Sequence, residues 1–483
     1  MSELDRLVNA CLMPAFQGPT PPRWLHEHLA DGLGGVIIFG PQLVGGVTVS
    51  QITATLREWQ PDLLVALDEE GGDVTRLDYL TGSRYPGNLA LGVVDDEQLT
   101  YDVARSMAED LAAASVNLNF APSVDVNSNP ENPVIGVRSF GSDPERVAAH
   151  GVAYIRAMEE RRIATSPKHF PGHGDTRDDS HHALPVIDCD LETFRRRELL
   201  PFVAAIEAGA QTIMTAHVVF SALDDQPATL SRRILTGLLR EELGYDGVIV
   251  TDALDMAGVS RAHGIAGAAV LSLKAGADIL LIGSEEGDVP CANIRRAVAD
   301  AVAAGELDVA RLEEAAARVQ RLREWAAPGP YVAADVRAGV GLEAARRAIR
   351  TTGPLPLQSP AFTVELRAGT NPAVGEAHWS LIEALEGLGF AAGSMTVVEG
   401  GASPDEVISK AGDAPLVVAV RDAYRQPWQG EWLSSVLAAR PDAVVVAIGM
   451  PDDRAVAGDT LVLTHGAGVF NIQAAAEVLS GRS

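Results

Sequence analysis

The chain has 483 residues, 47% of them hydrophobic, and carries a formal net charge of −27. This length exceeds what a single hydrophobic core organises, so we expect more than one domain. The acidic excess excludes nucleic acid and anionic membrane surfaces as expected partners, because both would repel the chain. No apolar run is long enough to span a membrane, and the first residues lack the basic start of a secretory signal.

Cysteine usage indicates the redox compartment. Cys11, Cys189 and Cys291 are far apart in the sequence and form no CxxC or Cys/His spacing. This pattern argues against a disulfide framework and a structural zinc site, and it is typical of a reducing compartment. We therefore expect a cytoplasmic protein.

Short apolar runs alternate with helical patterns from the start of the chain to about residue 325. The intervening stretches 143–161, 191–208 and 260–275 have helical periodicity. Eight β units alternating with helices predict a closed (β/α)₈ barrel. The alternative is a doubly wound open sheet, but no glycine-rich dinucleotide fingerprint follows the first strand candidate. The eight strand candidates are residues 10–16, 35–40, 63–68, 116–125, 163–170, 211–217, 247–252 and 278–283.

The pattern changes after a predicted helix over residues 308–325, which Asp308 can cap. The segment AAPGPYVAAD that follows indicates a break in the chain. We predict a barrel domain at residues 1–330, a linker at 331–354 and a smaller three-layer α/β domain at 355–483. The elements expected in the last domain are strands at 362–368, 415–422, 443–450 and 460–466 and helices near 378–388, 431–439 and 469–479.

Unusual polar clusters follow the third to the seventh of the strand candidates. In a barrel of this type, the loops at the carboxyl ends of the strands build one rim, where active sites form. The clustering therefore predicts one functional site at that rim. The clusters are ALDEEGG (66–72), FAPSVDV (120–126) with IGVRSFG (135–141), KHFPGHGDTRDDSHH (168–182), TAH (215–217) and TDALDM (251–256).

Asp252 is the first candidate catalytic residue, because it ends the apolar strand candidate GVIVT at the expected barrel mouth. A carboxylate fixed there has the chemistry of a nucleophile or a general base. The alternative is a structural one, in which Asp252 is the N-cap of a helix that begins near Leu254.

The loop after the fifth strand candidate contains Asp179-Ser180-His181. If the loop turns back, the Asp179 carboxylate can fix the tautomer of the His181 imidazole and raise its basicity. The alternative is a polar loop with an incidental histidine. In the same loop, His173 between two glycines fits a turn residue as well as a contact residue, and we interpret His182 as a bystander.

Several residues near these ends have the chemistry to bind a sugar. Asp68 ends its strand candidate ahead of two glycines, and its carboxylate suits hydrogen bonds to vicinal hydroxyls, with a metal ion as the rival ligand. Arg138 could donate a guanidinium fork to the same ligand, or form a salt bridge that pins its loop. Lys168 and His169 lie at a strand end, where His169 could also be a satisfied core histidine.

Four motifs together resemble glycoside hydrolase family 3, specifically its β-N-acetylhexosaminidase branch. They are KHFPGHGDTRDDSH, DEEGG followed by VTRL, IGVRSFGSDP and TDALDM, and the similarity covers almost the whole predicted barrel. The C-terminal part, ending in THGAG and AAAEVLSG, is similar to that family's second α/β domain.

The resemblance implies roles for matching positions. Asp252 would be the nucleophile, and His181 the general acid/base with Asp179 as its dyad partner. The residues implied to bind the hydroxyls of the terminal sugar are Asp68, Arg138, Lys168 and His169. The family needs neither a metal nor another cofactor. One position departs from the family pattern, because Asp73 stands where the family usually has a basic residue after the second glycine. This charge reversal beside the expected sugar site puts the preferred sugar in question.

The implied reaction is a retaining double displacement that removes terminal β-linked N-acetylglucosamine from a small amino-sugar β-glycoside. Asp252 attacks the anomeric carbon while His181 protonates the leaving oxygen, and water then resolves the intermediate. An imidazole does not repel phosphate as a carboxylate would, so phosphorolysis is one alternative. A different β-glycoside, such as a glucoside or a modified amino sugar, is another.

Two other classes of protein compete with this reading. A metal-dependent amidohydrolase barrel would fit the many His and Asp residues, but it needs a His-x-His pair after the first strand, where PAFQGP has none. A non-catalytic sugar-binding protein would keep Asp68 and Arg138, but it has no need of both Asp252 and the Asp179–His181 pair.

Overall fold

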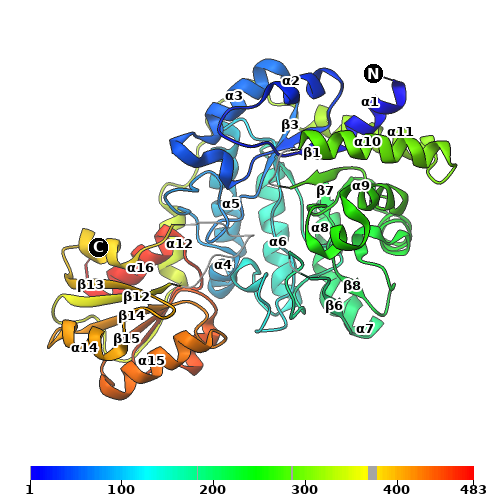
Figure 1. Cartoon of the computed structure of the whole chain (residues 1–483). Coiled ribbons are helices and arrows are strands. Elements are labelled where there is room, and N and C mark those ends of the chain that lie inside the picture. The colour runs from blue at the N-terminus through cyan, green and yellow to red at the C-terminus, as the bar shows by residue number, and fades with distance from the viewer. Residues whose placement is uncertain (1, 182, 284–286, 368–377, 483) are drawn as a thin grey trace. The chain divides into compact units, whose positions relative to one another are not determined.

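The computed structural model describes residues 2–181, 183–283, 287–367 and 378–482 (Figure 1). The chain forms two compact units. The first consists of Met1–Glu70, Thr100–Ile135 and Gly141–Arg337. The second consists of Gly71–Leu99, Gly136–Phe140 and Ala338–Ser483. Each unit is built around its own set of mainly parallel strands.

Eight short parallel strands form the barrel of the first unit, one within each of the eight strand candidates. Ladders join β2, β3, β4 and β5, then β7 and β9, then β10 and β1. Isolated bridges between Phe170 and Thr215 and between Val250 and Ile279 continue the pairing past the ladders. The predicted (β/α)₈ barrel is confirmed. The strands are β1 (Leu12–Pro14), β2 (Gly35–Ile37), β3 (Leu64–Leu67), β4 (Leu118–Asn119), β5 (Ala164–Thr165), β7 (Thr212–Met214), β9 (Val248–Val250) and β10 (Leu280–Ile282).

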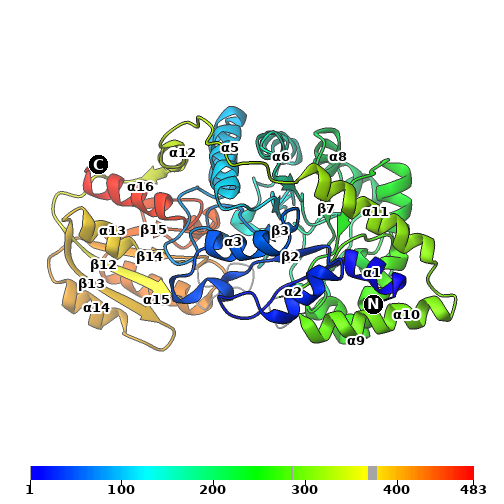
Figure 2. The ribbon, with the colours of Figure 1, turned by 90° about the horizontal axis from the view of Figure 1, so that it is seen from above.

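Apolar side chains from these strands fill the barrel. The buried cluster includes Met13, Leu64, Phe120 and Val250, together with Val319 from helix α11. Because this interior is packed with side chains, ligand chemistry is left to the rim. Figure 2 shows helices on the outside of the strands. These helices include α1 (Glu3–Ala10), α2 (Arg23–Ala30), α3 (Val49–Trp59), α5 (Glu97–Ala113), α6 (Pro144–Glu159), α8 (Leu200–Glu207), α9 (Ala257–Ala275), α10 (Asp288–Ala303) and α11 (Val309–Trp325).

Local sequence signals account for several helix boundaries. Asp308 caps α11 by accepting a hydrogen bond from the Ala310 N–H, as the sequence predicted. Asp143 caps α6 in the same way through the Arg146 N–H. The stretch 191–208, predicted to be one helix, is instead α7 (Leu191–Thr193), a π-helical turn η3 (Phe194–Glu198) and α8. Two further short strands, β6 (Val186–Ile187) and β8 (Val219–Phe220), lie in the segments that follow β5 and β7, and they form a small parallel pair.

The second unit contains a six-stranded sheet in the order β11-β16-β15-β14-β12-β13. Only β11 (Arg350–Thr352) is antiparallel to its neighbour. Four of the strands match the four predicted for this part of the chain, whereas β11 and β13 (Ala391–Val398) were not predicted. The other strands are β12 (Ala361–Arg367), β14 (Leu416–Val420), β15 (Val444–Ala447) and β16 (Leu461–Leu463).

Two separate apolar clusters cover the two faces of this sheet. One packs α14 (Pro404–Ala411) and α15 (Pro427–Ala439) against the strands, and the other packs α13 (Leu381–Gly387) and α16 (Val469–Ser480). This arrangement is the predicted three-layer α/β sandwich. Two further helices, α12 (Val340–Ala348) and α4 (Asn88–Val94), belong to the same unit and pack on each other. The expected linker at 331–354 thus holds α12 and β11.

None of the helices in the described ranges is both long and apolar enough to cross a membrane.

Candidate active site

Three histidines surround Asp252 at the carboxyl ends of the barrel strands. The residue follows β9, while His217 follows β7, and His169 and His181 lie in the long segment after β5. Burial acts to raise the pKa of the Asp252 carboxyl, but the charges of His217, His169 and His181 outweigh it and hold this pKa below its usual range. Asp252 is therefore held as a carboxylate at neutral pH.

Asp252 is not a helix cap. Its Oδ1 accepts a hydrogen bond from the Ala253 N–H at 2.8 Å, and helix α9 begins only at Ala257, with Met256 in the N-cap position. The structural alternative considered from the sequence, an N-cap for a helix beginning near Leu254, is therefore wrong. The other acidic residue of this motif, Asp255, accepts from the Gly283 N–H at 2.9 Å and so ties the segment to β10.

Asp179 and His181 form a close pair. The Asp179 Oδ1 lies 2.7 Å from the His181 Nδ1 and also accepts from the His181 N–H at 2.8 Å. A carboxylate at Nδ1 favours the tautomer that carries its proton there, which directs Nε2 away from the pair. The Asp179 side chain is 13% exposed and the His181 side chain is 24% exposed, so the imidazole keeps access to solvent and substrate. The loop therefore turns back on itself, which was the condition for a contact between Asp179 and His181.

Lys168 lies between two carboxylates. Its Nζ is 2.7 Å from the Asp68 Oδ1 and 2.7 Å from the Glu70 Oε1, and its side chain is 2% exposed. The structure therefore brings two of the predicted sugar-binding residues, Asp68 and Lys168, into direct contact. A lysine held in this way fixes the direction of the Asp68 carboxylate, whose side chain is 15% exposed.

His169 is held by Asp125, a residue that sequence reasoning passed over. The Asp125 Oδ2 is 2.7 Å from the His169 Nδ1, and the Oδ1 accepts from the backbone N–H groups of His169 and His173 at 3.1 and 2.7 Å. Burial acts to raise the pKa of Asp125, but the charge and hydrogen bond of His169 outweigh it, and the pKa is lowered. Asp125 lies in the FAPSVDV cluster after β4, so its position at a strand end was the available signal.

His217 is a second residue that was noted but not assigned. It is fully buried, with its Nδ1 2.8 Å from the Thr229 Oγ1 and its Nε2 3.0 Å from the Ala253 carbonyl oxygen. Burial lowers the pKa of His217, partly offset by the charge of Asp252. The contact with Ala253 fixes the backbone next to Asp252, and the TAH motif at the end of β7 was the sequence signal for it.

His173 is buried and makes side-chain contacts, so of the two alternatives left open by the sequence the structure shows a contact residue. Its ring nitrogens contact two hydroxyls, with Nδ1 2.9 Å from the Thr176 Oγ1 and Nε2 3.0 Å from the Ser180 Oγ. Burial lowers its pKa to about 4, so the ring is neutral at physiological pH. His182 lies outside the described residues.

Arg138 belongs to the second unit, at the end of the short 3₁₀ helix η2 (Gly136–Arg138). It is 7% exposed, and its carbonyl oxygen accepts a hydrogen bond from the Asn88 Nδ2 at 2.7 Å. Its assignment to the sugar site stays a prediction.

Asp73, the residue that departs from the family pattern, has its negative charge paired with an arginine of the second unit. Asp73 is buried, its Oδ2 pairs with the Arg421 guanidinium, and its Oδ1 accepts from the Ala467 N–H at 2.8 Å. Burial acts to lower the pKa of Arg421, but the charges of Asp73 and Asp422 outweigh it and raise the pKa. Both oxygens of Asp73 thus have partners within that unit. Arg421 follows β14, a position that carried no signal for this pairing in the sequence.

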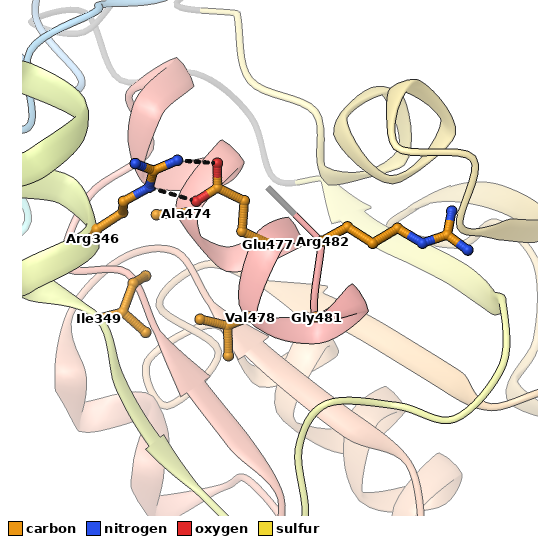
Figure 3. Close-up of a pocket in the computed structure, with 7 residues that line it drawn as sticks. All are labelled: Arg346, Ile349, Ala474, Glu477, Val478, Gly481 and Arg482. Carbon is orange, nitrogen blue, oxygen red and sulfur yellow. Dashed lines mark hydrogen bonds and ion pairs between the residues drawn. The ribbon is translucent and has the colours of Figure 1, made fainter. Parts of the chain in front are cut away.

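A pocket of about 350 Å³ in the second unit lies between α12 and the end of α16 (Figure 3). The two arginines that line this pocket already have hydrogen-bond partners in the protein. Arg346 forms a two-pronged contact with Glu477 at 2.7 and 2.8 Å, and Arg482 donates to the carbonyl oxygens of Leu388 and Gly389. We assign no function to this pocket. The lining residues are Arg346, Ile349, Ala474, Glu477, Val478, Gly481 and Arg482.

Among the residues that the structure describes, no group of three or more His, Cys, Asp or Glu side chains is arranged to hold a metal ion. The acidic and imidazole groups of the barrel rim are instead paired with one another, as Asp125 is with His169 and Asp179 with His181.

Comparison with known proteins gives the family. Residues 20–322 match the model of the glycosyl hydrolase family 3 N-terminal domain, and the chain belongs to this family. The resemblance inferred from the sequence is confirmed, and the match favours a glycosidase over a metal-dependent amidohydrolase.

Individual relatives agree with this placement. The chain is 35% identical over 378 residues to β-hexosaminidase A of Pseudoalteromonas piscicida, covering 69% of this chain and 62% of that protein. It is 39% identical over 251 residues to the β-hexosaminidase of Pseudomonas aeruginosa strain LESB58, covering 52% of this chain and 75% of the relative. A family 3 β-N-acetylglucosaminidase structure from Paenibacillus sp. str. FPU-7 has a TM-score of 0.90 at 32% identity, covering 100% of this chain and 97% of that one.

Proposed function

We propose that the chain is a retaining, exo-acting β-N-acetylhexosaminidase that removes terminal β-linked N-acetylglucosamine. The observation that carries the proposal is the placement of one carboxylate, Asp252, among three histidines, one of which is paired with its own carboxylate. The names of the similar proteins support an amino sugar as the substrate.

In the first step, an Asp252 oxygen attacks the anomeric carbon and forms a glycosyl ester. The bond from that carbon to the leaving oxygen breaks, and this oxygen takes the proton from the His181 Nε2. The lowered pKa keeps Asp252 ionised for attack. Asp179 at the His181 Nδ1 stabilises the protonated imidazole before transfer.

In the second step, the now neutral His181 takes a proton from water, whose oxygen attacks the same carbon. The ester bond to Asp252 breaks and returns the carboxylate. Because each step inverts the anomeric centre, the product keeps the β configuration.

The sugar hydroxyls would be bound by the network around Lys168. Asp68 and Lys168 offer an acceptor and a cationic donor 2.7 Å apart, which suits neighbouring hydroxyls that both donate and accept. The buried His169, with its Nδ1 on Asp125, can present its Nε2 to the same ligand. Arg138 is the fourth residue that the family resemblance assigns to sugar binding.

The test is a panel of 4-nitrophenyl β-glycosides, run on the wild type and on Asp252→Ala. We expect hydrolysis of the N-acetyl-β-glucosaminide by the wild type and near-complete loss in the variant. Asp246→Asn is the control, since Asp246 is an exposed residue of the same unit that pairs with Arg318 and Arg321. Failure of the wild type to cleave any glycoside would contradict the proposal, as would equal activity of Asp252→Ala. Sugar binding without any turnover would indicate a non-catalytic binding protein.

The acceptor in the second step is proposed to be water. His181 carries no negative charge in either protonation state, so phosphate is the second acceptor to test. Product analysis at saturating phosphate would show free sugar for a hydrolase and sugar 1-phosphate for a phosphorylase. The same panel separates amino sugars from glucosides.

A further inference from the structure

We propose that Ser180 is the positioning residue that sets the Asp179–His181 pair in its catalytic orientation, with the His173 ring as its hydrogen-bond acceptor. Ser180 lies between the two members of the pair and is 1% exposed. Its Oγ is 3.0 Å from the His173 Nε2. This inference rests on the proposed function, because it assigns His181 as the acid/base.

His173 is a rigid partner for that hydroxyl. Its backbone N–H donates to Asp125 at 2.7 Å, and its carbonyl oxygen accepts from the Asn132 Nδ2 at 2.8 Å. The Thr176 hydroxyl donates to the same carbonyl at 3.2 Å, so the Nδ1 of the ring carries the proton toward Thr176. The Nε2 is then the acceptor for the Ser180 O–H. A buried neutral ring with both nitrogens bonded cannot turn without losing hydrogen bonds.

The other side of Ser180 contacts the first turn of α9. The Ser180 carbonyl oxygen accepts from the Gly258 N–H at 3.2 Å. A side chain at Gly258 would begin 3.1 Å from the His217 Cβ and 3.2 Å from that carbonyl oxygen. The segment holding the dyad therefore packs closely against the helix that follows Asp252, which relates the position of the acid/base to that of the nucleophile.

Between these anchors, Arg177 and Asp178 are exposed. Residues up to Thr176 are held by Asp125 and Asn132, whereas Arg177 is 79% exposed and lies 3.9 Å from an exposed Glu131. Ser180 is thus where the chain packs into the protein again before His181. Loss of its hydroxyl should leave the fold of the barrel intact but allow the dyad to move.

A displaced acid/base has a specific kinetic effect. A substrate with a poor leaving group, such as a methyl glycoside or a chitin disaccharide, needs a proton on the leaving oxygen, whereas 2,4-dinitrophenolate leaves without one. Ser180→Ala should therefore lower kcat/KM about tenfold for the poor leaving group, the equivalent of one buried hydrogen bond, and change it little for the dinitrophenyl glycoside. A variant that is only less stable would lose activity equally on both substrates.

The experiment compares Ser180→Ala with Ser128→Ala, which removes a hydroxyl that is buried without a partner among the described residues. Ser128→Ala should behave as wild type on both substrates. His173→Gln tests the acceptor, and because Ser180 acts through His173, adding Ser180→Ala to it should cause little further loss. Equal losses on the two substrates, or additive effects of the two substitutions, would overturn the inference.

A second readout does not depend on turnover. In protein labelled with ¹⁵N-histidine, the His181 Nδ1 proton bound to Asp179 should give a downfield NMR signal in the wild type. The signal should broaden or disappear in Ser180→Ala and persist in Ser128→Ala. An unchanged signal in Ser180→Ala would contradict the positioning role. If instead the wild type cleaves no glycoside, the proposed function fails, while the NMR signal still decides whether Ser180 holds the pair.

Discussion

Both units gather carboxylates at the carboxyl ends of parallel strands, but different groups surround them. In the barrel, Asp252 accepts one backbone hydrogen bond within the described part of the chain and has three histidines around it. In the sandwich, Asp453 in the 3₁₀ helix η6 (Pro451–Ala455) accepts from the backbone N–H groups of Asp422 and Tyr424 at 2.9 and 3.0 Å. Asp422 accepts from the Met450 N–H and pairs with Arg425.

This difference is the one that we expect between the proposed nucleophile, Asp252, and a structural carboxylate, Asp453. Burial and the charge of Asp422 raise the pKa of Asp453 to about 7, whereas the histidines lower that of Asp252. A carboxyl whose oxygens are bonded to backbone amides stabilises a loop. One that faces titratable rings keeps its charge and its capacity to attack carbon. The position of a carboxylate at a strand end is therefore not sufficient to predict catalysis.

The largest contrast should come from replacing the two carboxylates in turn. Asp252→Asn should lower kcat by about 10³-fold or more, since the amide cannot form the glycosyl ester, with little change in thermal stability. Asp453→Asn should leave kcat near the wild-type value and cost about 1–3 kcal/mol of unfolding free energy, because one backbone N–H loses its acceptor. Kinetics and urea unfolding on both variants measure this. Loss of turnover in Asp453→Asn with the fold intact would contradict the distinction.

The next effect concerns the dyad. Asp179→Asn should reduce kcat/KM by about 10²–10⁴-fold for substrates with poor leaving groups, because the amide no longer stabilises the protonated imidazole. The loss should be much smaller for 2,4-dinitrophenyl glycosides. The measurement is kcat/KM of wild type and variant on both kinds of substrate. Asp178→Asn is the control, because Asp178 is an exposed neighbour in the same loop. Equal losses on both substrates would mean that Asp179 does not act through proton transfer.

In the sandwich, Asp73→Ala should cost about 3 kcal/mol of unfolding free energy, because it leaves the Arg421 charge and the Ala467 N–H without their acceptor. Replacing both members, as in Asp73→Leu with Arg421→Met, should cost less than the sum of the single changes. Chemical denaturation of the single and double variants measures the coupling. Additive costs would show that the two charges do not stabilise each other.

The smallest predicted effect is a change of folding stability with pH, which is caused by a glutamate of the barrel unit. Burial raises the pKa of Glu159 to about 7, despite hydrogen bonds from Thr165 and Gln211, so the folded state binds a proton that the unfolded state releases near pH 4.3. Wild-type stability should therefore fall as the pH rises from about 4.5 to 7. Glu159→Gln should match the wild type near pH 5 and exceed it by about 2 kcal/mol at pH 8.

Urea unfolding at the two pH values tests this prediction. Glu207→Gln, which replaces an exposed carboxylate of α8 in the same unit, is the control. A difference between Glu159→Gln and the wild type that is the same at both pH values would contradict the assignment of this titration to Glu159.

Local patterns in the sequence predicted much of the fold and site. All eight barrel strands were found because each is a short apolar run between helical patterns, and the Asp179–His181 contact was predicted because the residues are two apart. The edge strand β13 was missed because its residues are largely exposed and form no continuous apolar run. The boundaries set at residues 330 and 355 stay predictions.

Contacts between distant segments could not be predicted in the same way. Asp125 meets His169 because neighbouring strands place Ser123 beside Lys168, 45 residues later in the chain. The pairing of Asp73 with Arg421 joins residues 348 positions apart. No local property of either segment specifies such a partner, so it emerges only from the packed structure.

The central claim is that Asp252 forms a covalent bond to the sugar. A 5-fluoro analogue of N-acetyl-β-glucosaminyl fluoride slows both steps and allows the intermediate to accumulate, so that mass spectrometry of peptides can locate the attached sugar. We predict a single modified peptide that carries the sugar on Asp252, and none in Asp252→Asn. Attachment to another residue, or turnover with inversion and no attached sugar, would contradict the account.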